Sequence, residues 1–83
     1  MTITYANNVL VAIVAEASRG LTKQEILEIN ARTYKAELKK YWDFIESNTS
    51  LFIYKRKDKY YLKPSFDYNL KWKREHVIKF SKK

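Results

Sequence analysis

The most chemically distinctive stretch of the sequence is a dense run of cations. Lys55-Arg56-Lys57-Asp58-Lys59 places four positive side chains in five residues. Long basic side chains at this density reach phosphate groups without needing one particular rotamer. Such a run is also typical of a strand edge that lysines protect against aggregation. Its chemistry is electrostatic, and a polyanion is the ligand that it suits.

Charge is distributed unevenly along the 83 residues, whose formal net charge is +8. Residues 1–50 contain six basic and six acidic side chains, so their charges cancel. Residues 51–83 contain eleven basic and three acidic side chains. This asymmetry favours a polyanionic partner, most often nucleic acid and less often an acidic protein or a membrane surface. The alternative is a lysine-rich surface that keeps the protein soluble.

Residues that could carry catalysis or bind a metal are few. The sequence has no Cys, which excludes disulfides, thiol nucleophiles and Cys-ligated zinc or iron–sulfur sites. His76 is the only His, so no second imidazole can share a metal with it. Glu37-Leu38-Lys39 resembles the Glu-x-Lys part of a nuclease site, but no Asp precedes it and helical spacing would separate the two side chains. We therefore expect a protein that is not an enzyme and that has no cofactor or metal.

The apolar residues do not predict a membrane protein. The longest uninterrupted apolar run, residues 9–15, has seven residues, whereas a membrane-spanning helix needs about 20. No Lys or Arg precedes Arg19, so the charged start of a secretory signal peptide is lacking. We expect a cytoplasmic protein without a membrane partner. The excess of Lys over Arg is associated with A+T-rich genomes such as those of phages and mobile elements. If the protein comes from such a genome, we expect it in the cytoplasm of the host.

The elements that position the cations follow from apolar spacing. Apolar residues between Ile3 and Ala17 recur at steps of three and four. This spacing predicts an amphipathic helix over residues 4–18 with one narrow apolar stripe. Gly20, the only glycine, is predicted to end that helix in a left-handed conformation.

A short second helix and a longer third helix are predicted next. Thr22-Lys23-Gln24-Glu25 has the sequence of a capping box, which predicts that the second helix starts at Lys23. Residues 30–33 predict a turn, with Thr33 as the following N-cap. Apolar residues then step by three and four over residues 34–47, which predicts the third helix. Two helices joined by so short a turn form a helix-turn-helix unit.

Beyond residue 50 the apolar period changes from helical to alternating, which predicts a β-hairpin. We expect its strands at residues 51–56 and 59–63. Because the connection contains neither Gly nor Asn, a loose loop within residues 55–59 is expected rather than a tight two-residue turn.

The predicted hairpin has two distinct faces. Ile53 lies opposite Leu62 on one face and Tyr54 lies opposite Tyr61 on the other. Most other aromatic residues recur at helix or strand spacing and are expected in core or half-buried packing rather than as base-stacking platforms: Tyr34, Tyr41, Trp42, Phe44, Phe52, Phe66 and Trp72. Tyr54, Tyr60 and Tyr61 interleave with lysines, a pattern that also suits single-stranded nucleic acid.

Residues 65–83 form a basic, aromatic C-terminal extension. Their apolar residues fit strand and helix spacing alike, and we favour a helix from about Asn69 to Phe80. Side chains as large as Trp72 and Val77 are costly to leave in water, so the extension is expected to pack on the domain or to pair with a second copy.

The element order of helix, short helix, turn, longer helix and basic hairpin resembles that of winged helix-turn-helix domains over residues 4–64. Gly20-Leu21-Thr22, Leu51-Phe52-Ile53 and Tyr60-Tyr61-Leu62 are similar to stretches of the small winged-helix modules of phage, archaeal and restriction-associated proteins. The expected fold is therefore mostly α with a small β-hairpin, in which residues 1–64 form a domain of three helices and a two-stranded wing. The C-terminal extension is expected to be helical.

The resemblance implies that the third helix enters the major groove of duplex DNA and that the wing contacts the backbone or the minor groove. The residues that we expect to contact nucleic acid are Arg32, Thr33, Lys35, Ala36, Lys39, Lys40, Lys55, Arg56, Lys57, Lys59, Lys71, Lys73 and Arg74. A solvated helix face with a Lys39–Asp43 pair is the alternative for the lysines of the third helix.

The expected function is a small duplex-DNA-binding transcriptional regulator, either monomeric or a homodimer. The alternative function is a winged-helix interaction module, such as a phage-type inhibitor that binds an acidic surface of a host protein. A fold alone does not decide between these two functions.

Overall fold

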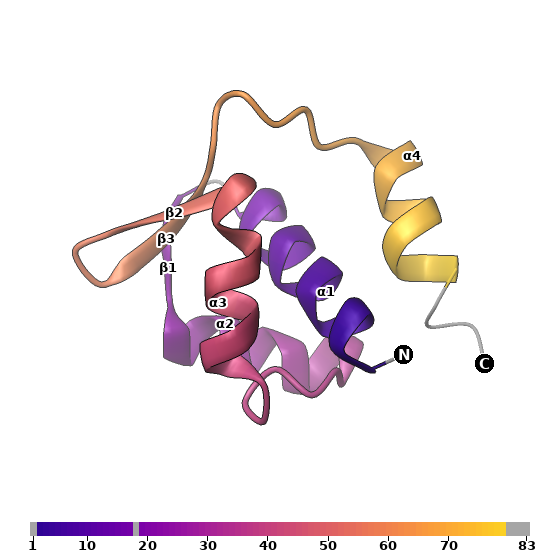
Figure 1. The fold of residues 1–83 in the computed structure, drawn as a ribbon, viewed down its shortest axis with the longest axis horizontal. Helices are drawn as coiled ribbons and strands as arrows, with labels where there is room; N and C mark the ends of the chain where they lie inside the picture. Colours follow the sequence, from indigo (N-terminus) through magenta and orange to yellow (C-terminus); the bar gives the residue numbers. More distant parts are fainter. Residues whose placement is uncertain (1, 18, 80–83) are drawn as a thin grey trace.

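A computed structural model describes residues 2–17 and 19–79 of the chain (Figure 1). The elements in chain order are α1 (Thr2–Glu16), β1 (Leu21–Thr22), α2 (Lys23–Ile29), the π-helical segment η1 (Asn30–Tyr34), α3 (Trp42–Asn48), the 3-10 turn η2 (Thr49–Leu51), β2 (Ile53–Arg56), β3 (Lys59–Leu62), α4 (Leu70–Lys73) and the π-helical segment η3 (Arg74–Ile78). The fold is therefore mostly helical with a small antiparallel sheet, as expected. None of the described helices has the length and apolar content needed to cross a bilayer.

Helix α1 is the centre of the core and not the helix with a narrow apolar stripe that was predicted. All side chains of residues 9–14 are buried, because α1 contacts α2, α3, β3 and η3. Figure 1 shows α1 lying between α3 on one side and α4 on the other. A helix that is covered on several sides is apolar around most of its circumference.

Gly20 does not have the predicted left-handed conformation, since no described glycine has a positive φ. Its role is close packing. A Cβ atom at Gly20 would lie 2.6 Å from Cζ of Tyr61 and 2.9 Å from Cβ of Lys59. The missing side chain therefore allows the chain before β1 to approach β3 closely.

Helix α2 starts at Lys23, as the capping box predicted. Thr22 Oγ1 accepts a hydrogen bond from the Glu25 amide at 3.2 Å, and Glu25 Oε1 accepts one from the Thr22 amide at 2.9 Å. Two amides that have no partner within the helix are thus satisfied.

The predicted turn at residues 30–33 is wrong, because these residues continue the helix as η1. The helix ends at Lys35, which has a left-handed φ of 57°. The buried side chain of Asn30 holds the loop that follows: its Nδ2 donates to the Ala36 carbonyl at 2.8 Å, and its Oδ1 accepts from the Ala36 amide at 2.9 Å. The turn therefore lies later in the chain than predicted.

Helix α3 is consequently shorter than the predicted helix over residues 34–47, since it begins only at Trp42. The apolar spacing still identified inward-facing residues: Leu38, Trp42 and Ile45 are all buried. Leu38 belongs to the turn before α3, so its burial comes from anchoring a connection and not from a helix face.

The hairpin has the predicted register, with Ile53 paired with Leu62 and Tyr54 paired with Tyr61. The expectation of a loose loop is wrong, because two residues alone connect β2 to β3 and Lys57 adopts a φ of 59°. The sheet also has a third strand that was not predicted: β1 pairs antiparallel with β3 and gives the order β1-β3-β2. A strand of two residues is too short to show an alternating pattern.

The C-terminal extension forms a helix that packs against α1. Asn69 caps its start, with Oδ1 accepting from the Trp72 amide at 3.0 Å. Val77 is 1% exposed and belongs to the core, and Asn8 Nδ2 donates to the His76 carbonyl at 3.0 Å. The predicted end at Phe80 lies outside the described residues.

Candidate nucleic-acid interface

The hairpin tip gathers the four cations of the basic run at a projecting point of the molecule. Figure 1 shows that the hairpin extends away from the helices. The side chains of Lys55, Arg56, Lys57 and Lys59 are all exposed. Within residues 2–17 and 19–79 the one ion pair joins Lys73 and Glu16, so none of these four cations is held in an ion pair. Their charge is available to an external anion.

The inner face of the hairpin, which we define by Ile53, Lys55 and Tyr60, is turned toward α3. The Tyr60 hydroxyl donates a hydrogen bond to Glu46, and the Lys55 ammonium lies 5.7 Å from the centre of the Tyr60 ring. Burial and this hydrogen bond raise the pKa of Tyr60 to about 12. Tyr60 therefore stays protonated at neutral pH and fixes the hairpin to α3.

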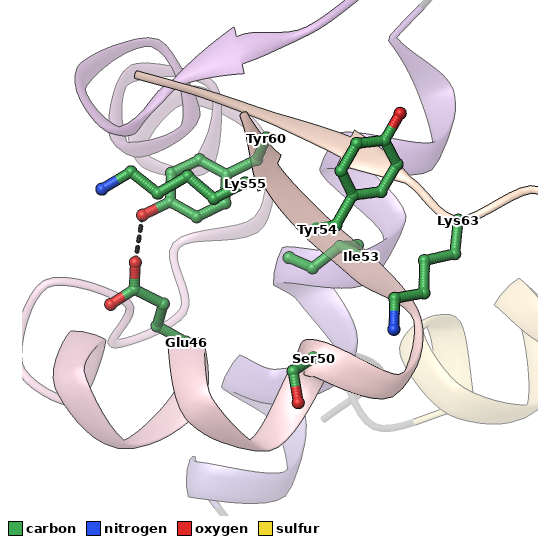
Figure 2. Close-up of a pocket in the computed structure, with 7 residues that line it drawn as sticks. All are labelled: Glu46, Ser50, Ile53, Tyr54, Lys55, Tyr60 and Lys63. Carbon is green, nitrogen blue, oxygen red and sulfur yellow. Dashed lines mark hydrogen bonds between the residues drawn. The ribbon is translucent and has the colours of Figure 1, made fainter. Parts of the chain in front are cut away.

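A hollow of about 290 Å³ lies beside this contact and is shown in Figure 2. Lys55 and Lys63 lie at opposite sides of it, and Ser50 lines it from η2. The only carboxylate in its lining, Glu46, accepts the hydrogen bond from Tyr60. Two lysines, the Ser50 hydroxyl, Tyr54 and the hydrogen-bonded Glu46–Tyr60 pair therefore share one hollow.

The outer face of the hairpin is defined by Tyr54, Arg56, Lys59 and Tyr61, which the register places together. The rings of Tyr54 and Tyr61 stack with their centres 5.4 Å apart and their planes at 20°. Arg19 lines a hollow beside this pair. Sequence reasoning missed Arg19, because nothing local indicated that the chain before β1 would lie against the hairpin.

The cations predicted for a groove-binding helix are not on one helix face. Arg32 and Thr33 are exposed in η1, Lys35 ends that segment, and Lys39 and Lys40 are exposed in the turn before α3. Ala36 is half-buried, and its backbone is bonded to Asn30. The expectation that Lys35, Ala36, Lys39 and Lys40 belong to the third helix is wrong, since α3 begins only at Trp42.

Helix α3 itself has no basic residue. Asp43 lies in its first turn and Glu46 one turn later, and Phe44 is 52% exposed. Carboxylates near the start of a helix repel phosphates at the position where base contacts would be made. The charge of α3 is therefore opposite to that of a helix that enters a DNA groove.

Lys73 has an intramolecular role. Its ammonium lies 2.8 Å from Glu16 Oε2 and 5.7 Å from the centre of the Tyr34 ring. The Glu16 carboxylate also accepts hydrogen bonds from the hydroxyls of Tyr34 at 3.2 Å and Tyr68 at 2.6 Å. We call Glu16, Tyr34, Tyr68 and Lys73 the Glu16 cluster.

The protonation of the Glu16 cluster is set by these contacts. Burial alone would raise the pKa of Glu16, but the hydrogen bonds from Lys73 and Tyr68 outweigh it and hold that pKa below its usual value. The hydrogen bond to Glu16 raises the pKa of Lys73. Lys73 is thus a charged partner of Glu16 and not a free contact for phosphate.

The other two C-terminal cations of the predicted interface are exposed but distant from the hairpin. Lys71 and Arg74 lie on α4 and η3. Figure 1 places α4 and the hairpin tip at opposite ends of the longest axis of the molecule, which measures 36 Å. The structure therefore separates the predicted residues into the hairpin, the connection before α3 and the C-terminal helix.

Comparison of the chain with protein-family models, with curated proteins and with solved structures finds no match. Among the described residues, no group of three or more His, Asp or Glu side chains could hold a metal ion. The function of the chain has to be inferred from the geometry and charge of its own side chains.

Proposed function

We propose that the chain is a small winged helix-turn-helix protein that binds nucleic acid, with duplex DNA as its ligand. The element order supports this fold, because α1, α2 and α3 precede a hairpin in the position of a wing. Strand β1 attaches that hairpin to the chain between α1 and α2, so the wing has a fixed direction relative to the helices.

The observation that carries the proposal is that the cations of the hairpin tip are exposed and are not held in ion pairs within the described chain. Four exposed cations lie on or beside a two-residue turn, and no ion pair within the described residues involves them. Cations in this state attract the phosphates of a duplex and release its condensed counterions on binding. The exposed Arg32, Lys35, Lys39 and Lys40 add positive charge along the connection that precedes α3.

The proposal gives α3 a small part in recognition. Phosphate contacts set the position of a protein on DNA, whereas sequence is read from base edges. Because α3 is short and has Asp43 in its first turn, we propose that phosphate contacts from the wing supply most of the affinity. Selection of one sequence by α3 alone, as a transcriptional regulator needs, is not part of the proposal.

Titration of the protein with a duplex of about 20 base pairs at several salt concentrations tests this function. If four to six phosphates are contacted, a plot of log K against log salt has a slope of about −4 to −5. A slope near zero, or the absence of binding at low salt, would contradict the proposal.

The second candidate function is a protein-interaction module, and the exposed apolar residues of α3 and η2 favour it. Phe44 is 52% exposed and Leu51 is 74% exposed. They lie in two successive elements, α3 and η2. An exposed apolar patch is typical of a protein interface. Failure of every nucleic acid to bind at low salt would favour this function over the first.

A further inference from the structure

The outer face of the hairpin combines two features that the tip alone does not have. Tyr54 and Arg56 lie on this face of β2, and Lys59 and Tyr61 lie on it from β3. The described residues that line the adjoining hollows add Arg19 on one side and Lys57 with Asp58 on the other. The outer face therefore carries an aromatic pair between cations, with one carboxylate at its edge.

The two rings of the aromatic pair have different surroundings. The Tyr61 ring lies against Gly20, where any Cβ atom would come within 2.6 Å of it. Tyr54 stacks on Tyr61 with an interplanar angle of 20° and is itself 40% exposed. The Tyr61 ring thus packs against the backbone at Gly20, whereas part of the Tyr54 side chain is left uncovered by the described chain.

We infer that the outer face binds single-stranded nucleic acid, with a base stacked on Tyr54 and neighbouring phosphates bound by Arg56 and Lys59. This inference rests on the proposed function and adds a single-stranded ligand for the outer face of the wing, beside the duplex that the cations of the tip bind. Base-on-tyrosine stacking beside a basic groove is how proteins bind single strands without reading sequence. In duplex DNA the base faces are covered by their neighbours, so Tyr54 has no such partner there.

The spacing along the strand agrees with this arrangement. Arg56 follows Tyr54 by two residues, so their Cα atoms are about 7 Å apart along the same face. Lys59 is the direct cross-strand partner of Arg56. A nucleotide on Tyr54 therefore has the cations Arg56 and Lys59 beside its phosphate. Glu46 lines the hollow that Tyr54 borders, and its carboxylate is hydrogen-bonded to Tyr60 on the inner face.

A cross-strand tyrosine pair also stabilises a hairpin, and this structural effect has to be separated from binding. Three substitutions separate them. Tyr54→Leu keeps apolar bulk on the strand but removes the ring. Tyr54→Phe keeps the ring and loses the hydroxyl. Phe44→Leu removes a ring that is 52% exposed, against 40% for Tyr54, from the helix that contacts the inner face through Glu46 and Tyr60, and serves as the control.

The test measures the affinity of each variant for a 12-residue thymidine oligonucleotide and for a duplex, at one salt concentration. We expect Tyr54→Leu to weaken single-strand binding by about 5- to 100-fold and duplex binding by less than twofold. Tyr54→Phe and Phe44→Leu should bind the single strand as the unmodified chain does. Equal single-strand affinity of Tyr54→Leu and the unmodified chain would overturn the inference and leave duplex binding intact.

A second measurement does not depend on the folding of any variant. An abasic oligonucleotide of the same length has the same phosphates but no bases. The unmodified protein should bind it about 5- to 100-fold more weakly than the thymidine oligonucleotide. Equal binding of the two oligonucleotides overturns the inference alone, whereas no binding to these or to the duplex overturns the proposed function as well.

Discussion

The carboxylate of Glu16 and the ammonium of Lys73 lie 2.8 Å apart and connect the end of α1 to α4. They are 57 positions apart in the chain, and Tyr34 and Tyr68 add hydrogen bonds to the same carboxylate from two other segments. The C-terminal helix is therefore attached to the domain by a polar cluster at one end and by the buried side chain of Val77 at the other.

The first prediction is that removing the Glu16 carboxylate loosens the C-terminal helix. Glu16→Ala deletes the ion pair and both tyrosine hydrogen bonds, which should lower the free energy of unfolding by about 1 kcal/mol. For a domain of this size such a loss lowers the melting temperature by about 4–8 °C. Thermal melting followed by circular dichroism measures it. Glu25→Ala would not be a fair control because it removes a helix cap, so the exposed Glu28→Ala serves instead.

The second prediction concerns pH. Because the pKa of Glu16 is lower in the folded chain than its usual value of 4.5, the stability that it contributes is complete above pH 4.5. That stability is lost as the pH falls through the lowered folded pKa. Lys73 behaves in the opposite sense, because its pKa is raised in the folded chain. The stability that Lys73 contributes is complete below pH 10.5, its usual pKa, and is lost as the pH rises through the raised folded pKa.

Denaturant unfolding at pH 7 and at pH 3 measures this effect. Glu16→Gln should be less stable than the unmodified chain at pH 7, and the difference should shrink at pH 3. A difference that is the same at the two pH values would show that the carboxylate charge of Glu16 contributes nothing to stability.

The third prediction distinguishes the hairpin cations from those of the C-terminal helix. Arg56→Ala with Lys57→Ala removes two charges from the wing, which should weaken duplex binding and reduce the salt slope by about 2 units. Lys71→Ala with Arg74→Ala removes the same charge from the other end of the long axis and should leave the slope unchanged. The same titration series measures both. Equal losses from the two pairs would mean that net charge, and not the wing, determines affinity.

Features that depend on neighbours in the sequence could be predicted. The capping box at Thr22 involves a partner three residues away, and the hairpin register follows from alternation along two adjacent strands. These signals are local, so no knowledge of the tertiary fold was needed to recognise them.

Features that depend on distant contacts could not be predicted. The role of Lys73 is set by Glu16 on another helix, and Gly20 is required by the ring of Tyr61 on β3. Among the candidate site residues, the exposed cations of the hairpin followed from their sequence pattern, but the placement of Lys39 and Lys40 outside α3 did not. That placement depends on the end of η1 at Lys35 and on the hydrogen bonds by which the buried Asn30 holds the loop that follows.

The fourth prediction concerns the close packing of Gly20. Gly20→Ala places a Cβ atom under 3.0 Å from Tyr61 and Lys59, so β3 or the Tyr61 ring has to shift, at a cost of about 1–3 kcal/mol. Tyr61→Val removes the ring and should make a second substitution at Gly20 less harmful. A double-mutant cycle on the free energy of unfolding measures this coupling. Additive losses would show that the Gly20–Tyr61 contact does not limit the residue at position 20.

The last prediction is that the Asn30 side chain holds the loop between η1 and α3. Its amide both donates to and accepts from the backbone of Ala36 at 2.8 and 2.9 Å, while Asn30 itself is only 6% exposed. Asn30→Ala leaves two backbone groups of Ala36 without these partners and should cost about 1–3 kcal/mol. Asn30→Asp keeps an acceptor for the Ala36 amide but sets a carboxylate against the Ala36 carbonyl, so it should also destabilise the chain at neutral pH. Amide hydrogen exchange locates the effect: protection should fall at Ala36, while Ile53, whose strand pairing does not involve this loop, stays protected. Unchanged exchange at Ala36 in Asn30→Ala would mean that the left-handed turn at Lys35 forms without the two hydrogen bonds from Asn30.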